Sequence, residues 1–179
     1  MKTEFSRGFT LVELMVAISV AGILLAVGVP SFSAMIQNNR MSSRINEMVA
    51  EINFARSEAV KRGSPVTLCR GTSSGCNSNA AWASGWIVFS DVTGNGVLNT
   101  ATDAILRVHG VLTGISSVNF SNSSTNRITF SAAGSATGYA TTITFCDSRG
   151  VSHAMGLVLS NSGRLRKWVT TDNLVLVCQ

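Results

Sequence analysis

Residues 7–39 read RGFTLVELMVAISVAGILLAVGVPSFSAMIQNN, a long apolar segment near the start of the chain. No charged residue lies between Glu13 and Arg40. A helix of about 20 apolar residues spans the hydrocarbon core of a bilayer, and the run from Leu14 to Met35 reaches that length. A secretory signal peptide has a shorter apolar stretch that ends in small residues, and this segment has no such end. We therefore predict a membrane helix over residues 9–35.

Glu13 is an acid inside this apolar segment. A carboxylate at the centre of a membrane helix costs about 2.5–3.5 kcal/mol on insertion scales. Either Glu13 lies near the end of the helix, where its carboxylate reaches the lipid headgroups, or a cation pairs with it.

After Asn39 the pattern becomes that of an amphipathic helix. Apolar residues recur at steps of three and four, which places them in one stripe: Met41, Ile45, Met48, Ile52, Ala55 and Ala59. Gly63 and Pro65 follow in the order that ends a helix, while Pro30 should bend or loosen the helix upstream. We expect residues 36–63 to continue the helix and to pack this stripe against the rest of the chain.

Residues 64–179 have the spacing of short strands separated by Gly, Asn and Ser turns. The candidate strands are Val66–Arg70, Trp86–Ser90, Ala104–Leu112, Ile115–Ser121, Arg127–Ser131, Thr141–Cys146, Ala154–Ser160, Arg164–Val169 and Leu174–Cys178. The predicted fold class is α+β: a long N-terminal helix packed on an antiparallel, β-rich head, with the strands divided between two small sheets.

Four cysteines allow three disulfide pairings. An even number in a secreted head indicates disulfides. We favour Cys69–Cys76, which closes a small loop, together with Cys146–Cys178, which ties the C-terminal segment to a strand, and the other two pairings stay open. The sequence does not indicate zinc, because it has no C-x-x-C motif and because His109 and His153 are isolated.

Two short patterns resemble catalytic or metal-binding motifs but lack the required context. Residues 71–75 read GTSSG, yet a nucleophile elbow needs a strand before it and a helix after it. Residues 91–96 read DVTGNG, but a calcium loop starting there would place Thr93 and Thr102 where acidic ligands are wanted. A tight turn explains this segment as well. We expect no enzymatic activity, no cofactor and no bound metal.

Charged residues make up 13% of the chain, about half the usual share of ~25%, yet the net charge is +5. The basic excess is concentrated where the turn sequence NSG (161–163) precedes RLRKW (164–168). Strand alternation places Arg164, Arg166 and Trp168 on one face. Lys167 joins them only if the strand is a sheet edge or contains a bulge. Two guanidinium groups about 6.6 Å apart beside an indole could bind successive phosphates. The alternative is a solvated strand face with Trp168 packed in the head.

The segment RGFTLVE (7–13) resembles the prepilin-peptidase site of type IV pilins and type II secretion pseudopilins. The resemblance implies that prepilin peptidase removes a leader, residues 1–8, after Gly8, and that the new N-terminal Phe9 is methylated. It implies that Glu13 pairs with the N-terminal amine of a neighbouring subunit. The chain would first lie in the bacterial inner membrane as a single-pass protein with its head in the periplasm. It would then join other pilin subunits in a pilus at the cell surface.

A second block, WASGWIVFSDVTGNG (82–96), is similar to a stretch of the FimT/FimU and GspH group of minor pilins and pseudopilins. In addition, GRLR (163–166) looks like the C-terminal G-R-x-R element of FimT-type minor pilins, which capture DNA for uptake in natural transformation. This implies non-specific binding of double-stranded DNA through Arg164, Arg166 and Lys167, with Arg149 as a possible neighbour. Relatives that only build filaments carry short G-R-x-R sequences too. The alternative is therefore a structural minor pilin, or a type II secretion pseudopilin, that primes or caps filament assembly without binding DNA.

Overall fold

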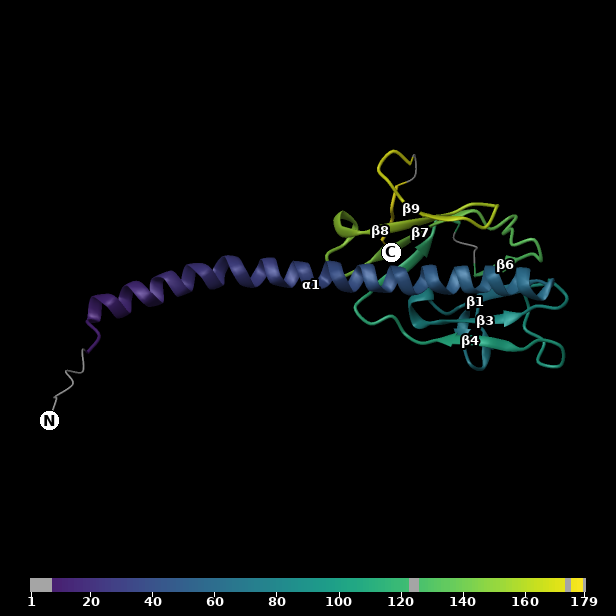
Figure 1. The fold of residues 1–179 in the computed structure, drawn as a ribbon, viewed down its shortest axis with the longest axis horizontal. Helices are drawn as coiled ribbons and strands as arrows, with labels where there is room; N and C mark the ends of the chain where they lie inside the picture. The colour runs from purple at the N-terminus through teal and green to yellow at the C-terminus, as the bar shows by residue number, and fades with distance from the viewer. Residues whose placement is uncertain (1–7, 123–125, 173–174, 179) are drawn as a thin grey trace. The chain divides into compact units, whose positions relative to one another are not determined.

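A computed structural model describes residues 8–122, 126–172 and 175–178 of the chain. The chain divides into two compact units, one ending at Asn39 and the other running from Arg40 to Gln179. The leader up to Arg7 lies outside the described residues. One long helix, α1 (Leu11–Arg62), contributes to both units (Figure 1).

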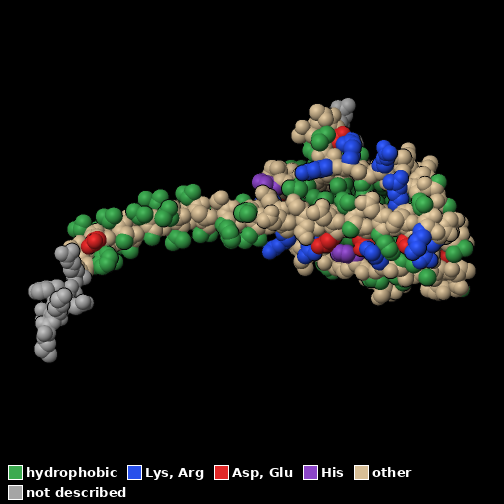
Figure 2. All heavy atoms as spheres, in the orientation of Figure 1, with side chains coloured by type: hydrophobic (Ala, Val, Ile, Leu, Met, Phe, Trp, Pro, Cys, Tyr) green, Lys and Arg blue, Asp and Glu red, His purple; other side chains and the backbone are tan. Residues whose placement is uncertain are grey.

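The first unit consists of the N-terminal part of α1 and the residues before it. Thr10 and Glu13 form a capping box at the start of the helix: the Glu13 N–H donates to Thr10 Oγ1 at 3.2 Å, and the Thr10 N–H donates to Glu13 Oε2 at 3.4 Å. Apolar side chains then line the helix (Figure 2), which is long and apolar enough to cross a membrane. The helix is unbroken at Pro30.

The second half of α1 forms the spine of the other unit. The predicted stripe is confirmed: Met41, Met48, Ile52, Ala55 and Ala59 are all buried, and Ile45 packs against them. The helix ends at Arg62, and Gly63 follows with a φ of 62°, a backbone conformation that glycine adopts readily. Gly63 therefore turns the chain out of α1 and into the first strand.

Two antiparallel sheets complete this unit, and in Figure 1 they lie on either side of α1. The five-stranded sheet has the order β2-β1-β3-β4, with β6 paired to β1. Its strands are β1 (Val66–Thr72), β2 (Gly75–Cys76), β3 (Trp86–Ser90), β4 (Ile105–His109) and β6 (Arg127–Phe130). The four-stranded sheet has the order β5-β7-β8-β9, with β5 (Ser117–Phe120), β7 (Thr141–Cys146), β8 (Met155–Leu159) and β9 (Leu165–Lys167).

The larger of the two hydrophobic clusters in the described residues joins α1 to both sheets. Its members include Leu68, Trp86 and Phe130 from the five-stranded sheet and Phe145 and Leu159 from the four-stranded one. Complete burial of one such side chain contributes about 1.5–3 kcal/mol. Because both sheets bury their inner faces against the same helix, the β-rich head depends on α1 for its core.

The segment 82–96 contributes buried aromatic side chains to this core. Trp82, in the short 3-10 helix η1 (Trp82–Ser84), stacks on Phe120 with ring centroids 4.6 Å apart. Trp86 is fully buried and stacks on His109 at 4.1 Å. A Cβ at Gly85 would lie 2.5 Å from the backbone oxygen of His109, so only glycine fits between the two tryptophans.

The predicted strands are present, except that the structure has one strand that was not predicted and lacks one that was. The structure adds β2, which pairs with β1 beside the Cys69–Cys76 disulfide. The strand predicted at Leu174–Cys178 is wrong, because residues 175–178 form no strand and Leu174 lies outside the described residues. This segment lies on the sheet instead: Leu176 is buried beside Gly156, and Cys178 is bonded to Cys146. Both disulfides have the favoured pairing.

Candidate nucleic-acid interface

The turn before β9 is the predicted hairpin. The Gly163 N–H donates to the Ser160 carbonyl at 2.9 Å, and the Ser160 N–H donates to the Arg164 carbonyl at 3.0 Å. Gly163 has a φ of 74°, and a Cβ there would lie 2.3 Å from the backbone oxygen of Gly134. Glycine is therefore required to bring Arg164 close to the neighbouring turn.

β9 is an edge strand, which is one of the two conditions under which Lys167 could join the arginines. It pairs with β8, so that Leu165 lies opposite Leu159, Arg166 opposite Val158 and Lys167 opposite Leu157. Side chains directly opposite one another share a face of the sheet. Lys167 and Leu165 therefore lie on the face that covers α1, while Arg166 lies on the outer face. At the edge, all three basic side chains of this hairpin are exposed.

Arg166 is exposed but already has an acidic partner. Its guanidinium forms a two-pronged ion pair with Asp172, with 2.8 Å between Arg166 Nη1 and Asp172 Oδ2. Asp172 is held in place by the Val169 N–H, which donates to Oδ2 at 2.9 Å. The bond from Arg166, aided by that of Val169, lowers the pKa of Asp172 to about 2. An anionic ligand must compete with this carboxylate for Arg166.

Arg164 and Lys167 differ from Arg166 in this respect. Among the described residues, no acidic side chain pairs with either of them. Figure 2 shows basic side chains gathered over the region of β8 and β9, with an acidic side chain beside them. Arg164 and Lys167 are therefore the cations of this hairpin that are most available to phosphate.

Arg149 does not belong to this group. Phe145 pairs with Met155 at one end of β8, so the loop after β7 lies at that end, whereas the turn before Arg164 lies at the other. Arg149 Nη2 lies 2.6 Å from Asp147 Oδ2, and both side chains are largely buried. The hydrogen bond from Arg149 lowers the pKa of the Asp147 carboxyl. The structure thus gives Arg149 a local partner at a distance from β9.

Arg56 is a cation near the hairpin that the sequence analysis missed. Its Nε donates to the Gly134 carbonyl at 2.9 Å, and it lies 3.2 Å from the point where a Cβ of Gly163 would be. Arg56 comes from α1, more than a hundred positions before Arg164. Arg56 lies near Arg164 only because α1 packs against the turn. No local pattern in the sequence predicts this proximity.

Trp168 is half-buried on the outer face of the sheet. Its N–H donates to the Gly156 carbonyl at 2.9 Å. A Cβ at Gly156 would lie 2.8 Å from both Trp168 Cβ and Leu176 Cδ2. Glycine at position 156 thus makes room for Trp168 and the C-terminal segment. Trp168 is thus held against Gly156 by its backbone bond and by the base of its side chain.

The two motif-like loops have structural explanations. GTSSG forms the hairpin between β1 and β2, with no helix after it. Asp91 is buried and accepts bonds from the N–H groups of Asn95 and Gly96, at 3.1 and 2.7 Å, and from Thr67 Oγ1 at 2.8 Å. These bonds occupy the carboxylate that a metal would need. The described residues contain no group of three or more His, Cys, Asp or Glu arranged to hold a metal.

At the N-terminal end, Gly8 and Phe9 precede α1 and are exposed, and Glu13 takes part in the capping box. The predicted cleavage and assembly residues thus lie together at the start of the helix.

Two family models match this chain, one near its N-terminus and one over most of the head. The family model described as Type II transport protein GspH matches residues 44–163, and the prokaryotic N-terminal methylation motif matches residues 5–29. No curated protein matches the chain significantly.

The fold is similar to that of the type IV minor pilin FimU of Pseudomonas aeruginosa PAO1, solved in two crystal forms. One structure has a TM-score of 0.58 and 22% identity, covering 75% of this chain and 92% of that one. The other has a TM-score of 0.55 and 21% identity, covering 73% and 94%. Similarity at these identities establishes a shared fold, which is that of the type IV pilins.

Proposed function

Because this chain belongs to the GspH family of type II transport proteins and has the type IV pilin fold, we propose that it is a minor pilin whose β9 edge binds double-stranded DNA for uptake in natural transformation. The observation that carries the proposal is the exposure of Arg164, just before the short edge strand β9, and of Lys167 at its end, with no acidic partner for either among the described residues. Arg166, once released from Asp172, and Arg56 would extend this basic surface.

Such a surface reads phosphates and not bases, so binding should be independent of sequence. A few cations on one domain support a dissociation constant near the non-specific range, about 10⁻⁴–10⁻⁶ M at physiological salt. Several subunits in one filament would raise the effective affinity without new contacts.

The N-terminal residues would mediate processing of the chain and its assembly into a filament. In this proposal prepilin peptidase cleaves after Gly8, Phe9 becomes the methylated N-terminus, and Glu13 pairs with the terminal amine of a neighbouring subunit. The carboxylate would then exchange its capping bond from Thr10 for a charged partner, which a buried carboxylate needs. The chain would lie in the inner membrane with its head in the periplasm before it joins the pilus at the cell surface.

The test combines binding and uptake. Full-length chain in a phosphatidylcholine nanodisc should bind duplex DNA of mixed sequence at low salt, and Arg164→Gln with Lys167→Gln should weaken binding at least tenfold. Arg40→Gln with Lys61→Gln removes the same charge elsewhere on α1 and should change binding less than threefold. In cells, the first double variant should retain pili and lose transformation.

The pairing of Arg166 with Asp172 favours a second candidate, a structural minor pilin or type II secretion pseudopilin that primes or caps a filament. In that case the ion pair would simply hold the C-terminal segment on the sheet. Equal DNA binding by the two double variants, or loss of pili with loss of transformation, would support this second role and contradict the first.

A further inference from the structure

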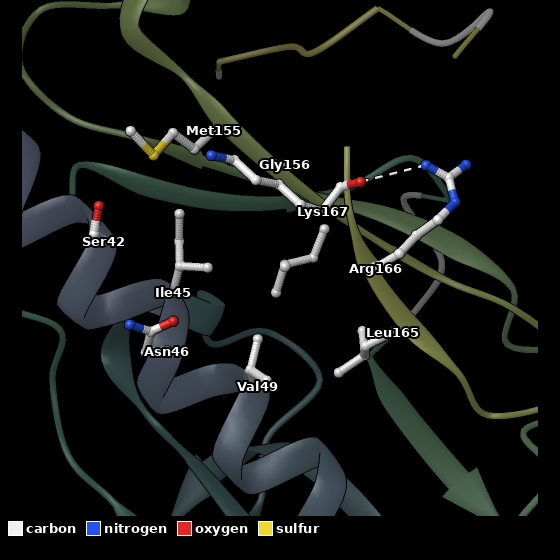
Figure 3. A pocket seen from close by; sticks show the side chains of 10 residues that line it. Ser42, Ile45, Asn46, Val49, Met155, Gly156, Leu165, Arg166 and Lys167 are labelled. Carbon is white, nitrogen blue, oxygen red and sulfur yellow. Dashed lines mark hydrogen bonds between the residues drawn. The ribbon is translucent and has the colours of Figure 1, made fainter. Parts of the chain in front are cut away.

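A pocket lies beside the basic edge, between α1 and the β8–β9 hairpin. Its volume is about 280 Å³, just below the range of about 300–1,000 Å³ that is common for pockets that hold drug-sized ligands. Apolar side chains from both elements line it, including Ile45, Val49 and Leu165 (Figure 3). It therefore fits one compact apolar group rather than a long chain.

Polar groups from both sides border the same pocket. Ser42 and Asn46 line it from α1, and Arg166 and Lys167 line it from β9. In Figure 3 the Lys167 side chain runs across the pocket and points toward Met155. Ser42, Asn46 and Lys167 use none of their side-chain polar atoms for a bond to another described residue.

These groups suit an aromatic ring with polar edges better than an alkyl group. A methionine sulfur favours contact with an aromatic ring, and an ammonium favours the ring face. The Asn46 amide presents donor N–H groups beside an acceptor oxygen, the combination that pairs with the edge of a base. An alkyl group would make no use of the exposed polar side chains of Asn46 and Ser42.

We propose that this pocket takes an unpaired nucleobase while Lys167, joined by Arg166 once it is released from Asp172, holds the phosphate attached to it. The inference rests on the proposed function, because Lys167 borders the pocket and also belongs to the basic edge, which Arg166 extends once it is released from Asp172. It adds a preference for unpaired over paired bases, which phosphate contacts alone do not give. Single-stranded DNA, or a frayed duplex end, should bind more tightly than a closed duplex of equal length.

The test compares three probes on the full-length chain in a phosphatidylcholine nanodisc: a single-stranded 12-mer, the same strand with abasic sugars, and the closed duplex. Stacking of one base on protein contributes about 1–3 kcal/mol, so the intact strand should bind at least fivefold more tightly than the abasic strand. Ser42→Leu with Asn46→Leu fills the pocket and should reduce binding of the intact strand to the abasic level. Duplex binding should stay within twofold.

Ser43→Leu with Ala50→Leu is the matched control, since both residues are exposed on α1 and neither lines the pocket. Equal binding of intact and abasic strands by the unaltered chain would overturn this inference and leave the proposed function standing. Absence of binding to all three probes would overturn both. A filled pocket that leaves all DNA affinities unchanged and abolishes pilus assembly would assign the pocket to a neighbouring subunit and overturn the inference.

Discussion

At the scale of single residues, Asp172 controls how much of the charge on Arg166 a ligand can use. The two side chains form a two-pronged ion pair, although slightly more than half of the Arg166 side chain is exposed to solvent (54%). The pair is therefore accessible to a phosphate that could displace the carboxylate. It is the clearest point at which the local structure opposes the proposed function.

A double-mutant cycle at Arg166 and Asp172 predicts the direction of the change in DNA affinity for each variant. Asp172→Asn should tighten DNA binding severalfold, because it releases a guanidinium. Arg166→Gln should weaken binding, because it leaves the Asp172 carboxylate facing the phosphates. The double variant should bind like the unaltered chain, since it removes one charge of each sign. Fluorescence anisotropy at low salt measures all four forms, and tighter binding by Arg166→Gln would contradict this account.

The pH dependence of this pair follows from its carboxyl group. Arg166 lowers the pKa of Asp172 to about 2 from an ordinary value of 3.8. A carboxyl whose folded pKa is lowered stabilises the fold fully above its unfolded pKa, and this contribution is lost as pH falls through the folded pKa. Asp172 therefore stays ionised between pH 5 and 8. The ratio of affinities between Asp172→Asn and the unaltered chain should be constant over that range.

Arg149 gives a contrasting expectation. Its side chain is largely buried and bonded to Asp147. Arg149→Gln should lower the free energy of unfolding by about 1–3 kcal/mol, because it removes the guanidinium from a buried carboxylate and leaves only the backbone N–H of residue 149 as a donor. Duplex DNA binding should not change. Chemical denaturation and anisotropy on the same sample test both parts, and a loss of DNA binding with unchanged stability would return Arg149 to the interface.

At the scale of elements, the sequence predicts those helices and strands that have a regular pattern of apolar residues. The buried stripe of α1 follows from steps of three and four, and most strands follow from short runs of strand-forming residues between Gly, Asn and Ser turns. β2 has no such pattern, because it is two residues held by a disulfide loop. The segment ending at Cys178 alternates like a strand, but the Cys146–Cys178 bond and the packing of Leu176 hold it on the sheet.

The candidate site was predictable to a similar degree. The turn and the exposure of its cations follow from local sequence. The partners of Arg166 and Arg149 are acids that the sequence shows nearby, but only geometry reveals that they form ion pairs. Arg56 could not be predicted, since its place beside Gly163 depends on how α1 crosses the sheet.

Packing on the outer face of the four-stranded sheet gives a prediction for Gly156. A Cβ there would lie 2.8 Å from both Trp168 and Leu176. Gly156→Ala should therefore displace the C-terminal segment and cost about 1–3 kcal/mol of stability, as overpacking does. Thermal unfolding and tryptophan fluorescence measure the effect. Unchanged stability with an unchanged emission spectrum would show that Trp168 does not pack on Gly156.

At the scale of the whole molecule, the second disulfide holds the end of the chain beside β7. Cys146→Ser with Cys178→Ser opens a loop with a sequence separation of 32 residues. Loss of a disulfide that closes a loop of this size costs about 2–4 kcal/mol, so the melting temperature should fall. The ion pair between Arg166 and Asp172 should also loosen, because Asp172 precedes the released segment, and DNA binding at low salt should then rise slightly.

The chain as a whole combines a helix able to cross a membrane with a basic edge on a low-charge head. The family and the fold account for the helix, the methylation motif and the shared core. The family and the fold do not explain the basic edge, because exposed cations on a filament subunit need not bind a ligand. The role of this edge therefore requires a direct binding measurement.

The most direct measurement is the salt dependence of duplex DNA binding by the full-length chain in a nanodisc. Each phosphate contact contributes about −0.9 to the slope of log K against log salt. We predict a slope that becomes less negative by about 1.8 in the Arg164→Gln, Lys167→Gln variant and stays unchanged in the Arg40→Gln, Lys61→Gln control. An equal slope in all three proteins would contradict DNA binding at the β9 edge.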